Sequence, residues 1–247
     1  HNRALAPAAG ADGRPTYRKQ ILGTYALLDR IRAAFPDVEI ESCAGGGGRI
    51  DAGIATRTHR FWTSDNNDAV SRIHIQRGFL QFMPPELMGA HIGASPAHAT
   101  GRRQSLDFRT LVAMPGHLGV EMDPRRLDPA GRDRLAGWIA RYKEWRGALH
   151  KRRTWTGQAA DSIHWQAQSD AKSLLLFVYR LDPATQRYTA DLPLAMLDPA
   201  RRYRVESLFP QEPDRLIDGS WLTGVGLPLP DLKAERGALF RLIAIDC

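Results

Sequence analysis

Two stretches of the sequence combine residue types that suit an active site, and the first is rich in glycine. Cys43 and Ala44 precede four consecutive glycines at positions 45–48. Because glycine has no Cβ, such a run lets the backbone approach a ligand closely. The preceding residues, 38–43, are typical of a short β-strand, and barrel enzymes place their active sites at the carboxyl ends of strands. The glycine run is therefore a candidate ligand-binding loop.

The second stretch carries two carboxylates behind another strand-like segment, residues 60–64. Asp65 follows that segment directly, and Asp68 lies where a helical pattern begins. An aspartate here can transfer protons in catalysis, or it can accept hydrogen bonds from the first N–H groups of the helix. On the residues alone, helix capping is the simpler interpretation of Asp65. Asp68 is the rival residue, more typical of a helix start or of a group behind the site.

These segments belong to a repeated pattern of strands and amphipathic helices. Strands are expected at residues 38–43, 60–64, 87–92 and 118–122, and helices at 17–35, 70–82, 106–114 and 129–149. Asp128 and Pro129 are a typical cap and first position for the last helix. The alternation predicts an α/β fold with a parallel sheet. Four such units cannot close an eight-stranded barrel of about 250 residues, so either the sheet is open or half a barrel is missing.

The pattern changes after His150. Strands are expected at residues 163–168, 173–181, 202–209, 222–228 and 238–245, separated by Asp-Pro, Pro-Asp and Asp-Gly turns with no helix between them. Short strands bounded by such turns predict a small antiparallel β-sandwich. We therefore expect an α/β domain at 1–150 and a β-sandwich domain at 151–247.

Composition argues against several classes of protein. The formal charge of +7 comes from basic residues that are spread along the chain, without the aromatic platforms of single-strand binders, so no nucleic-acid partner is expected. No apolar run reaches the roughly 20 residues that span a bilayer, and the first residues lack a signal-peptide pattern. Cys43 and Cys247 are too few for a disulfide framework, and the histidines show no zinc-binding spacing. We expect a soluble, cytoplasmic protein without a membrane partner, metal or cofactor.

Several motifs, taken in order, resemble one enzyme family. They are residues 41–51 (ESCAGGGGRID), 62–68 (WTSDNND), 84–91 (PPELMGAH) and 116–121 (GHLGVE). Together they resemble the bacterial α-galactosidases of glycoside hydrolase family 36, over essentially the whole chain and most strongly at 17–145. The resemblance implies the C-terminal half of a (β/α)8 TIM barrel, followed by a small antiparallel β-sandwich domain.

The same resemblance implies a function. A retaining α-galactosidase removes terminal non-reducing α-D-galactose from galacto-oligosaccharides such as melibiose or raffinose, by double displacement between two carboxylates. No cofactor is implied, and the parent enzyme is expected to be a homo-oligomer. Galactosyl-transfer enzymes of the same family remain an alternative. A non-catalytic carbohydrate-binding or scaffold protein is the alternative from another class.

Catalytic roles are implied for residues that match the family's motifs. Asp65 matches the general acid/base. The nucleophile of the family lies in a Lys-Trp-Asp-x-Asn-Arg motif, and residues 1–3 (HNR) match its last three positions. The nucleophile is thus expected immediately before His1 and absent from the chain. Asp51 and Asp123 are the next candidates, but neither matches the motif.

The resemblance implies contacts with galactose for Cys43, Gly46 and Asn2, and Trp62 is a further candidate as an aromatic platform for the sugar. Gly46 would let a backbone N–H reach a sugar hydroxyl, and Cys43 would present its sulfur in a small space. The alternatives are a buried structural thiol for Cys43 and a core side chain for Trp62. His91 is interpreted as structural.

The absence of a nucleophile has two expected consequences. The isolated chain should show no detectable hydrolysis, because removal of the attacking group costs orders of magnitude in rate. It should also be poorly soluble or oligomeric, since half a barrel exposes unpaired backbone groups and apolar side chains. The chain does not begin with Met, which suggests that residue 1 is internal to a longer protein.

Overall fold

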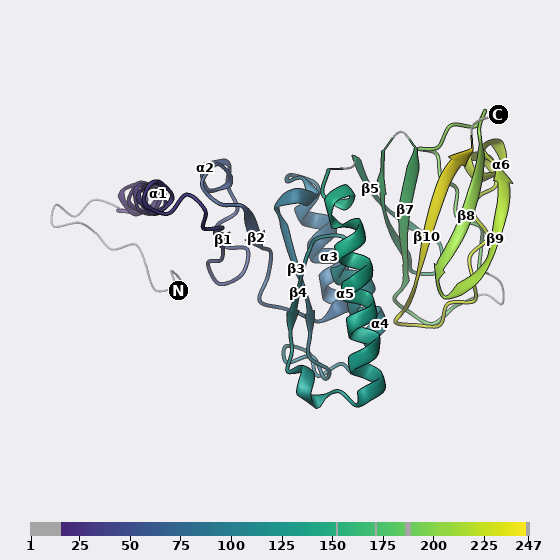
Figure 1. Ribbon diagram of the computed structural model, residues 1–247, viewed down its shortest axis with the longest axis horizontal. Helices are drawn as coiled ribbons and strands as arrows, with labels where there is room; N and C mark the ends of the chain where they lie inside the picture. The colour runs from purple at the N-terminus through teal and green to yellow at the C-terminus, as the bar shows by residue number, and fades with distance from the viewer. Residues whose placement is uncertain (1–15, 152, 171, 186–188, 246–247) are drawn as a thin grey trace.

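The computed structural model describes residues 16–151, 153–170, 172–185 and 189–245. This part of the chain is elongated, and a layer of helices separates a parallel sheet from an antiparallel sheet (Figure 1). The helices are α1 (Tyr17–Ala34), α2 (Ala52–Ala55), α3 (Ala69–Phe79), α4 (Leu106–Ala113), α5 (Pro129–Leu149) and α6 (Gly219–Gly224), with 3₁₀ turns η2 (Pro85–Leu87) and η3 (Pro124–Arg126).

The parallel sheet contains β1 (Glu41–Ser42), β2 (Arg60–Trp62), β3 (Met88–Gly93) and β4 (His117–Glu121), side by side in chain order. Each strand pairs in parallel with the next, and a helix connects each pair. The predicted α/β fold with a parallel sheet is therefore confirmed. The predicted cap of the long helix is confirmed as well, because the Asp128 carboxylate accepts a hydrogen bond from the Gly131 N–H at 2.7 Å.

The two faces of this sheet differ in chemistry, because successive residues of a strand point to opposite sides. Met88, Ala90 and Ile92 of β3 are fully buried and pack in the clusters beneath the helices. The opposite face carries mostly polar side chains or glycine, among them Glu41, Arg60, Trp62, Gly89, His91, Gly119 and Glu121. Chemistry on this sheet is therefore confined to the face away from the helices and to the strand ends.

The antiparallel sheet has six strands in the order β5-β6-β7-β10-β8-β9. They are β5 (Arg153–Ala159), β6 (Ile163–Ser169), β7 (Ser173–Arg180), β8 (Arg202–Phe209), β9 (Gln211–Asp218) and β10 (Arg236–Ile245). Phe177 and Leu239 on one face pack with Phe108 of α4 and Trp138 of α5, all nearly fully buried. This shared apolar cluster joins the antiparallel sheet to the helical layer.

Two predictions for this region are wrong. The described strands form a single sheet instead of a two-layer sandwich, and loops with α6 cover its second face. Residues 222–228, expected as a strand, contain the end of α6, although Leu222 and Leu227 are fully buried as a core strand would require. Strands β5 and β9 were not predicted. β9 is an edge strand and mostly exposed, so it lacks the apolar alternation that marks half-buried strands.

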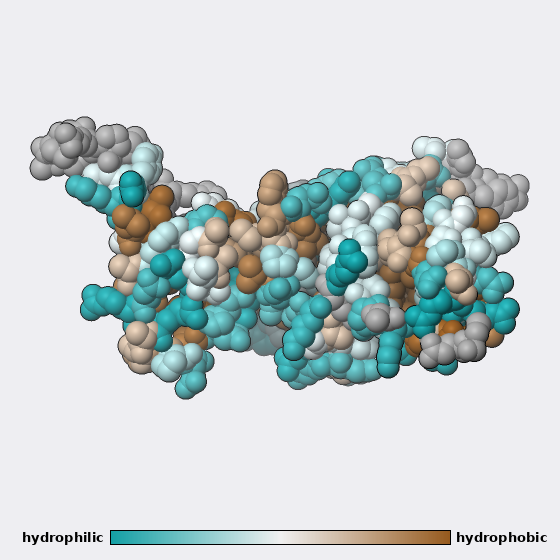
Figure 2. Space-filling view, turned by 90° about the horizontal axis from the view of Figure 1, so that it is seen from above, coloured by the Kyte–Doolittle hydropathy of each residue, from teal (hydrophilic) through white to brown (hydrophobic). Residues whose placement is uncertain are grey.

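Helix α1 lies at the opposite end of the molecule and contains no buried residue. Tyr25 and Leu28 pack partly against the apolar cluster around Phe61, whereas Leu22 and Leu27 are more than half exposed. Figure 2 shows hydrophobic side chains on the surface at this end. Among the helices that the structure describes, none is long and apolar enough to cross a membrane.

Candidate active site

The glycine run and Asp65 meet at the carboxyl edge of the parallel sheet. β1 leads into the glycine run and β2 leads into Asp65, and parallel pairing brings these two strand ends together. Gly46 is buried with φ +76°, and a Cβ at this position would lie 2.7 Å from the Asp65 nitrogen and 2.8 Å from the Ser64 Cα. A side chain there would clash with the backbone. The glycines thus allow the loop to rest directly on the strand end that carries Asp65.

The carboxylate of Asp65 is exposed, and the cap of α3 is Asp68. Asp68 is fully buried and accepts hydrogen bonds from the Ser71 N–H at 2.9 Å, the Thr100 hydroxyl at 2.7 Å and the Arg102 guanidinium at 2.8 Å. Burial alone would raise the pKa of Asp68, but these donors outweigh it and hold the pKa below its usual value. The capping alternative for Asp65 is therefore not observed, and Asp68 performs that structural role.

A buried arginine on α3 holds the residue before Asp65. Arg72 is 1% exposed, and its guanidinium donates to the Ser64 carbonyl at 3.1 Å and to the Gly89 carbonyl of β3 at 2.8 Å. Its Cζ lies 4.5 Å from the centroid of the Trp62 ring. Burial lowers the pKa of Arg72 to about 10, so the side chain keeps its charge at neutral pH. No sequence pattern indicates this contact, because an arginine inside a helix ordinarily lies on the solvated face.

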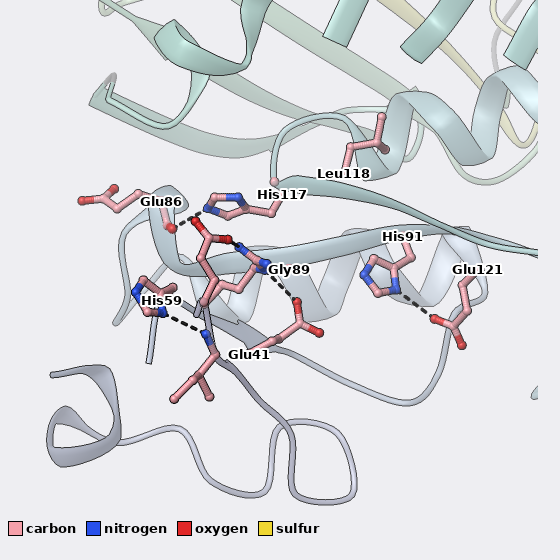
Figure 3. A network of polar contacts seen from close by, with 12 residues as sticks. Glu41, His59, Glu86, Gly89, His91, His117, Leu118 and Glu121 are labelled. Atoms are coloured by element: carbon pink, nitrogen blue, oxygen red, sulfur yellow. Dashed lines mark hydrogen bonds and ion pairs between the residues drawn. The ribbon is translucent and has the colours of Figure 1, made fainter. Parts of the chain in front are cut away.

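A second polar group lies along the same edge. Nδ1 of His91 is 2.9 Å from Oε2 of Glu121 (Figure 3). The Asn67 amide donates to the same oxygen at 3.1 Å. A carboxylate only accepts, so the His91 ring presents N–H at Nδ1. The His91 ring also stacks on Trp62 with centroids 4.2 Å apart. Glu121 thereby ties β4 to the loop after Asp65, a role that sequence reasoning did not assign.

Nearer the amino ends of the strands, the contacts in Figure 3 are structural. Arg60 pairs with Glu39 at 2.7 Å and with Glu41 at 3.2 Å, and the ring of His59 accepts from the Ile40 N–H at 2.9 Å. The side chain of His117 binds the Glu86 carbonyl, and burial lowers the pKa of His117. These residues cross-link neighbouring strands away from the edge that carries Asp65.

The remaining predicted contact residues differ in exposure. Cys43 is exposed with a free thiol, so the alternative of a buried structural thiol is not observed. Trp62 is 7% exposed and contacts Arg72 and His91, as a core side chain would, and a sugar-platform role for it stays a prediction. Asn2 and the chain start beside the expected nucleophile lie outside the described residues.

The two aspartates considered as substitute nucleophiles both cap short helices. Asp51 accepts hydrogen bonds from the Ile54 N–H at 2.9 Å and from the Tyr25 hydroxyl at 2.7 Å. Asp123 accepts from the Arg125 backbone and side chain. In the described part of the chain, no group of three His, Cys, Asp or Glu residues is arranged to hold a metal ion.

A parallel βα sheet that gathers a glycine-rich loop and an exposed aspartate at its carboxyl edge has the site layout of an α/β enzyme. Residues 2–151 match the family described as Melibiase. An α-galactosidase of Escherichia coli is 38% identical over 98% of this chain. The chain belongs to this family, the α-galactosidases of glycoside hydrolase family 36, and the resemblance inferred from its motifs is confirmed.

Solved structures agree with this assignment. The α-galactosidase AgaA from Geobacillus stearothermophilus has a TM-score of 0.86 and 31% identity, covering 98% of this chain and 33% of its own. A variant of AgaA in complex with raffinose has the same TM-score at 30% identity. This chain covers 37% of the length of the Escherichia coli protein, so it spans about a third of the length of these relatives.

Proposed function

We propose that this chain supplies the acid/base part of the active site of a retaining α-galactosidase. The single observation that carries the proposal is the close approach of Gly46 to the backbone of Ser64 and Asp65. This contact supports the proposal because it brings the glycine-rich loop next to the backbone of Asp65, an exposed residue. Membership of the family supports the choice of an α-linked galactoside as the ligand.

In the proposed mechanism Asp65 works with a nucleophilic carboxylate from outside residues 1–247. Protonated Asp65 donates its proton to the glycosidic oxygen as the nucleophile attacks the anomeric carbon, so the C–O bond breaks and a glycosyl-enzyme forms. Ionised Asp65 then takes a proton from water, whose oxygen attacks the same carbon and releases galactose. Retention by this route requires the two carboxyl groups to be about 5–5.5 Å apart.

Substrate binding follows from the loop. A backbone N–H near Gly46 and the exposed sulfur of Cys43 are proposed to contact the galactose ring, together with Asn2. Melibiose and raffinose are the proposed substrates, and the raffinose complex of the AgaA variant supports the second. The galactosyl-enzyme reacts with water in hydrolysis and with a sugar hydroxyl in transfer, and we propose hydrolysis as the main outcome.

The proposed architecture is half of a (β/α)8 barrel at 1–150 followed by a C-terminal β domain at 151–247. The four parallel strands in chain order, and the match of residues 2–151 to the family, support this division. The other four strands would then come from outside this chain, and we propose that the complete enzyme is a homo-oligomer.

Expression of two proteins tests the proposal. One is the 247-residue chain, and the other is the longest open reading frame that contains it. Assayed with melibiose, the chain alone is expected to release no galactose. The product of a reading frame that includes the upstream Lys-Trp-Asp is expected to hydrolyse melibiose. Strong turnover by the chain alone would contradict an external nucleophile. Binding of galactose by a frame that lacks any upstream nucleophile, without turnover, would favour the non-catalytic alternative.

A further inference from the structure

The side chain of Arg72 is a buried cation with no directly paired carboxylate in the described part of the chain, and Glu121 and Glu41 stabilise its charge only from a distance. Among the residues that the structure describes, no carboxylate forms an ion pair with Arg72, although the side chain is 1% exposed. A buried charge without a partner is costly, unless every donor is used well. By comparison Arg180, fully buried in β7, has the carboxylate of Asp161 at 3.7 Å.

Two donors of Arg72 bind backbone carbonyls of two neighbouring segments of the parallel sheet. Nη1 binds the carbonyl of Ser64, the residue directly before Asp65, and Nη2 binds the carbonyl of Gly89 in the next strand. The Ser64 carbonyl belongs to the peptide group whose nitrogen is that of Asp65. A planar peptide cannot rotate at one end alone, so Arg72 fixes the orientation of the Asp65 N–H and Cα as well.

Further contacts hold both the Arg72 guanidinium and the Ser64–Asp65 peptide in place. Gly46 closes on the same peptide from the glycine run. Nε of Arg72 lies 3.4 Å from the Gln76 amide oxygen, and the Gln76 amide donates to the Val112 carbonyl of α4 at 2.8 Å. The guanidinium is thereby tied to α3, to α4, to β3 and to the segment that follows β2. Its donors sit on separate nitrogens of a rigid plane and reach two carbonyls in fixed directions, whereas the donors of a lysine ammonium share one freely rotating nitrogen.

We infer that Arg72 is a positioning residue for general acid/base catalysis, which holds the Ser64–Asp65 peptide so that the Asp65 carboxyl reaches the glycosidic oxygen. The inference rests on the proposed role of Asp65. It implies a selective effect, because misplacement of the acid slows reactions that need a proton on the leaving group and spares those that do not. A displacement of about 1 Å costs on the order of 100-fold in rate at a positioned group.

The test compares two substrates in the longest open reading frame that contains this chain. Melibiose needs protonation of its leaving group, whereas 2,4-dinitrophenyl α-galactoside carries a leaving group that departs as an anion. In Arg72→Lys and Arg72→Met, kcat/KM for melibiose is expected to fall by about 100-fold. For the dinitrophenyl galactoside, kcat/KM is expected to stay within about 3-fold of the unmodified enzyme. Asp65→Asn gives the reference value, namely the largest difference between the two substrates that loss of the acid can produce.

Two arginine variants serve as controls. Arg77→Met removes an arginine of the same helix whose guanidinium donates to Gln158 at 3.4 Å. Arg180→Met removes a buried arginine at the end of β7, in the antiparallel sheet. Both are expected to treat the two substrates alike, and Arg180→Met is expected to lower the melting temperature. Arg72→Lys keeps the charge, so it remains informative if Arg72→Met fails to fold.

The outcomes separate the two proposals. If Asp65→Asn discriminates between the substrates and Arg72→Lys slows both equally, or slows neither, the positioning role is overturned and the role of Asp65 stands. If Asp65→Asn itself shows no discrimination, the proposed function is wrong and the role of Arg72 falls with it.

Discussion

Gly46 and Asp65 are 19 positions apart in the sequence, yet a methyl group on Gly46 would lie 2.7 Å from the Asp65 backbone nitrogen. The contact joins the carboxyl ends of β1 and β2. It makes the glycine run a packing requirement of the strand end that carries Asp65, in addition to its proposed role in binding sugar.

Gly46→Ala is therefore expected to lower the free energy of unfolding by more than the cost of a positive φ alone. A non-glycine residue at positive φ costs about 1–2 kcal/mol, and the clash with the Ser64 and Asp65 backbone adds to this cost. Gly101→Ala is the matched control, because Gly101 has φ +74° with open space around its Cβ position. In urea unfolding, Gly46→Ala should lower the free energy of unfolding clearly more than Gly101→Ala does. Equal decreases for the two variants would mean that the close approach of Gly46 to Asp65 does not matter for stability.

Asp68 is expected to make stability depend on pH. Because its pKa is lowered in the folded state, its carboxylate stabilises the fold above the unfolded pKa of about 4, and this contribution is lost as the pH falls further. Asp68→Asn should lower the free energy of unfolding by about 1–3 kcal/mol at pH 7. In urea titrations at several pH values, Asp68→Asn should also remove part of the decrease in the free energy of unfolding that occurs below pH 4.

The matched control for Asp68 is Asp128→Asn, which alters the cap of α5. Asp128 caps through the Gly131 N–H, whereas Asp68 also binds Thr100 and Arg102. An effect of Asp68→Asn no greater than that of Asp128→Asn would show that the contacts with Thr100 and Arg102 contribute nothing.

Cys43 offers a chemical probe of the site. Its exposed thiol should react with iodoacetamide in a Cys247→Ser background, and Cys43→Ala should abolish the labelling. If Cys43 contacts galactose, added galactose should slow the labelling at least several-fold, measured by mass spectrometry of the peptide that contains residue 43. Glucose serves as the control sugar, and labelling that is indifferent to galactose would remove Cys43 from the binding site.

Variants of Trp62 distinguish a structural role in the core from a role as a platform for the sugar. Because its ring is 7% exposed and packs on Arg72 and His91, Trp62→Ala is expected to lower the free energy of unfolding by about 3–5 kcal/mol. Trp221, 48% exposed, gives the control variant Trp221→Ala with a small effect. Trp62→Phe should leave KM for melibiose nearly unchanged, and a large rise in KM at unchanged stability would instead make Trp62 a platform.

Local patterns predicted the four strands of the parallel sheet and four of its helices, because these segments carry apolar periodicity bounded by turn or cap residues. The four-residue helix α2 was not predicted, since it is too short to show a period. Asp128 with Pro129 located the start of α5 correctly. The antiparallel region was harder, since the apolar run at 222–228 is too short to distinguish a buried strand from a buried helix end. Strand β9 was missed because its side chains are mostly exposed and its sequence shows no alternation.

The candidate site was predictable only in part. Motif order indicated Asp65 and the glycine run, but not the residues that hold them. The contacts of Arg72 and Glu121 depend on which strands and helices lie side by side. Arg72 has no local signal that distinguishes it from an ordinary surface charge, and the motif that ends at Glu121 did not indicate what its carboxylate binds.

Hydrolysis of melibiose by an Asp65→Asn variant of the longest open reading frame containing this chain tests the central claim most directly. General acid/base catalysis contributes about 10²–10⁴-fold, so kcat/KM should fall by that factor while the melting temperature stays unchanged. Because Asp65 is exposed, replacing it with asparagine is not expected to disturb the packing of the fold. Activity within about 3-fold of the unmodified enzyme would contradict the assignment of Asp65 as the proton donor.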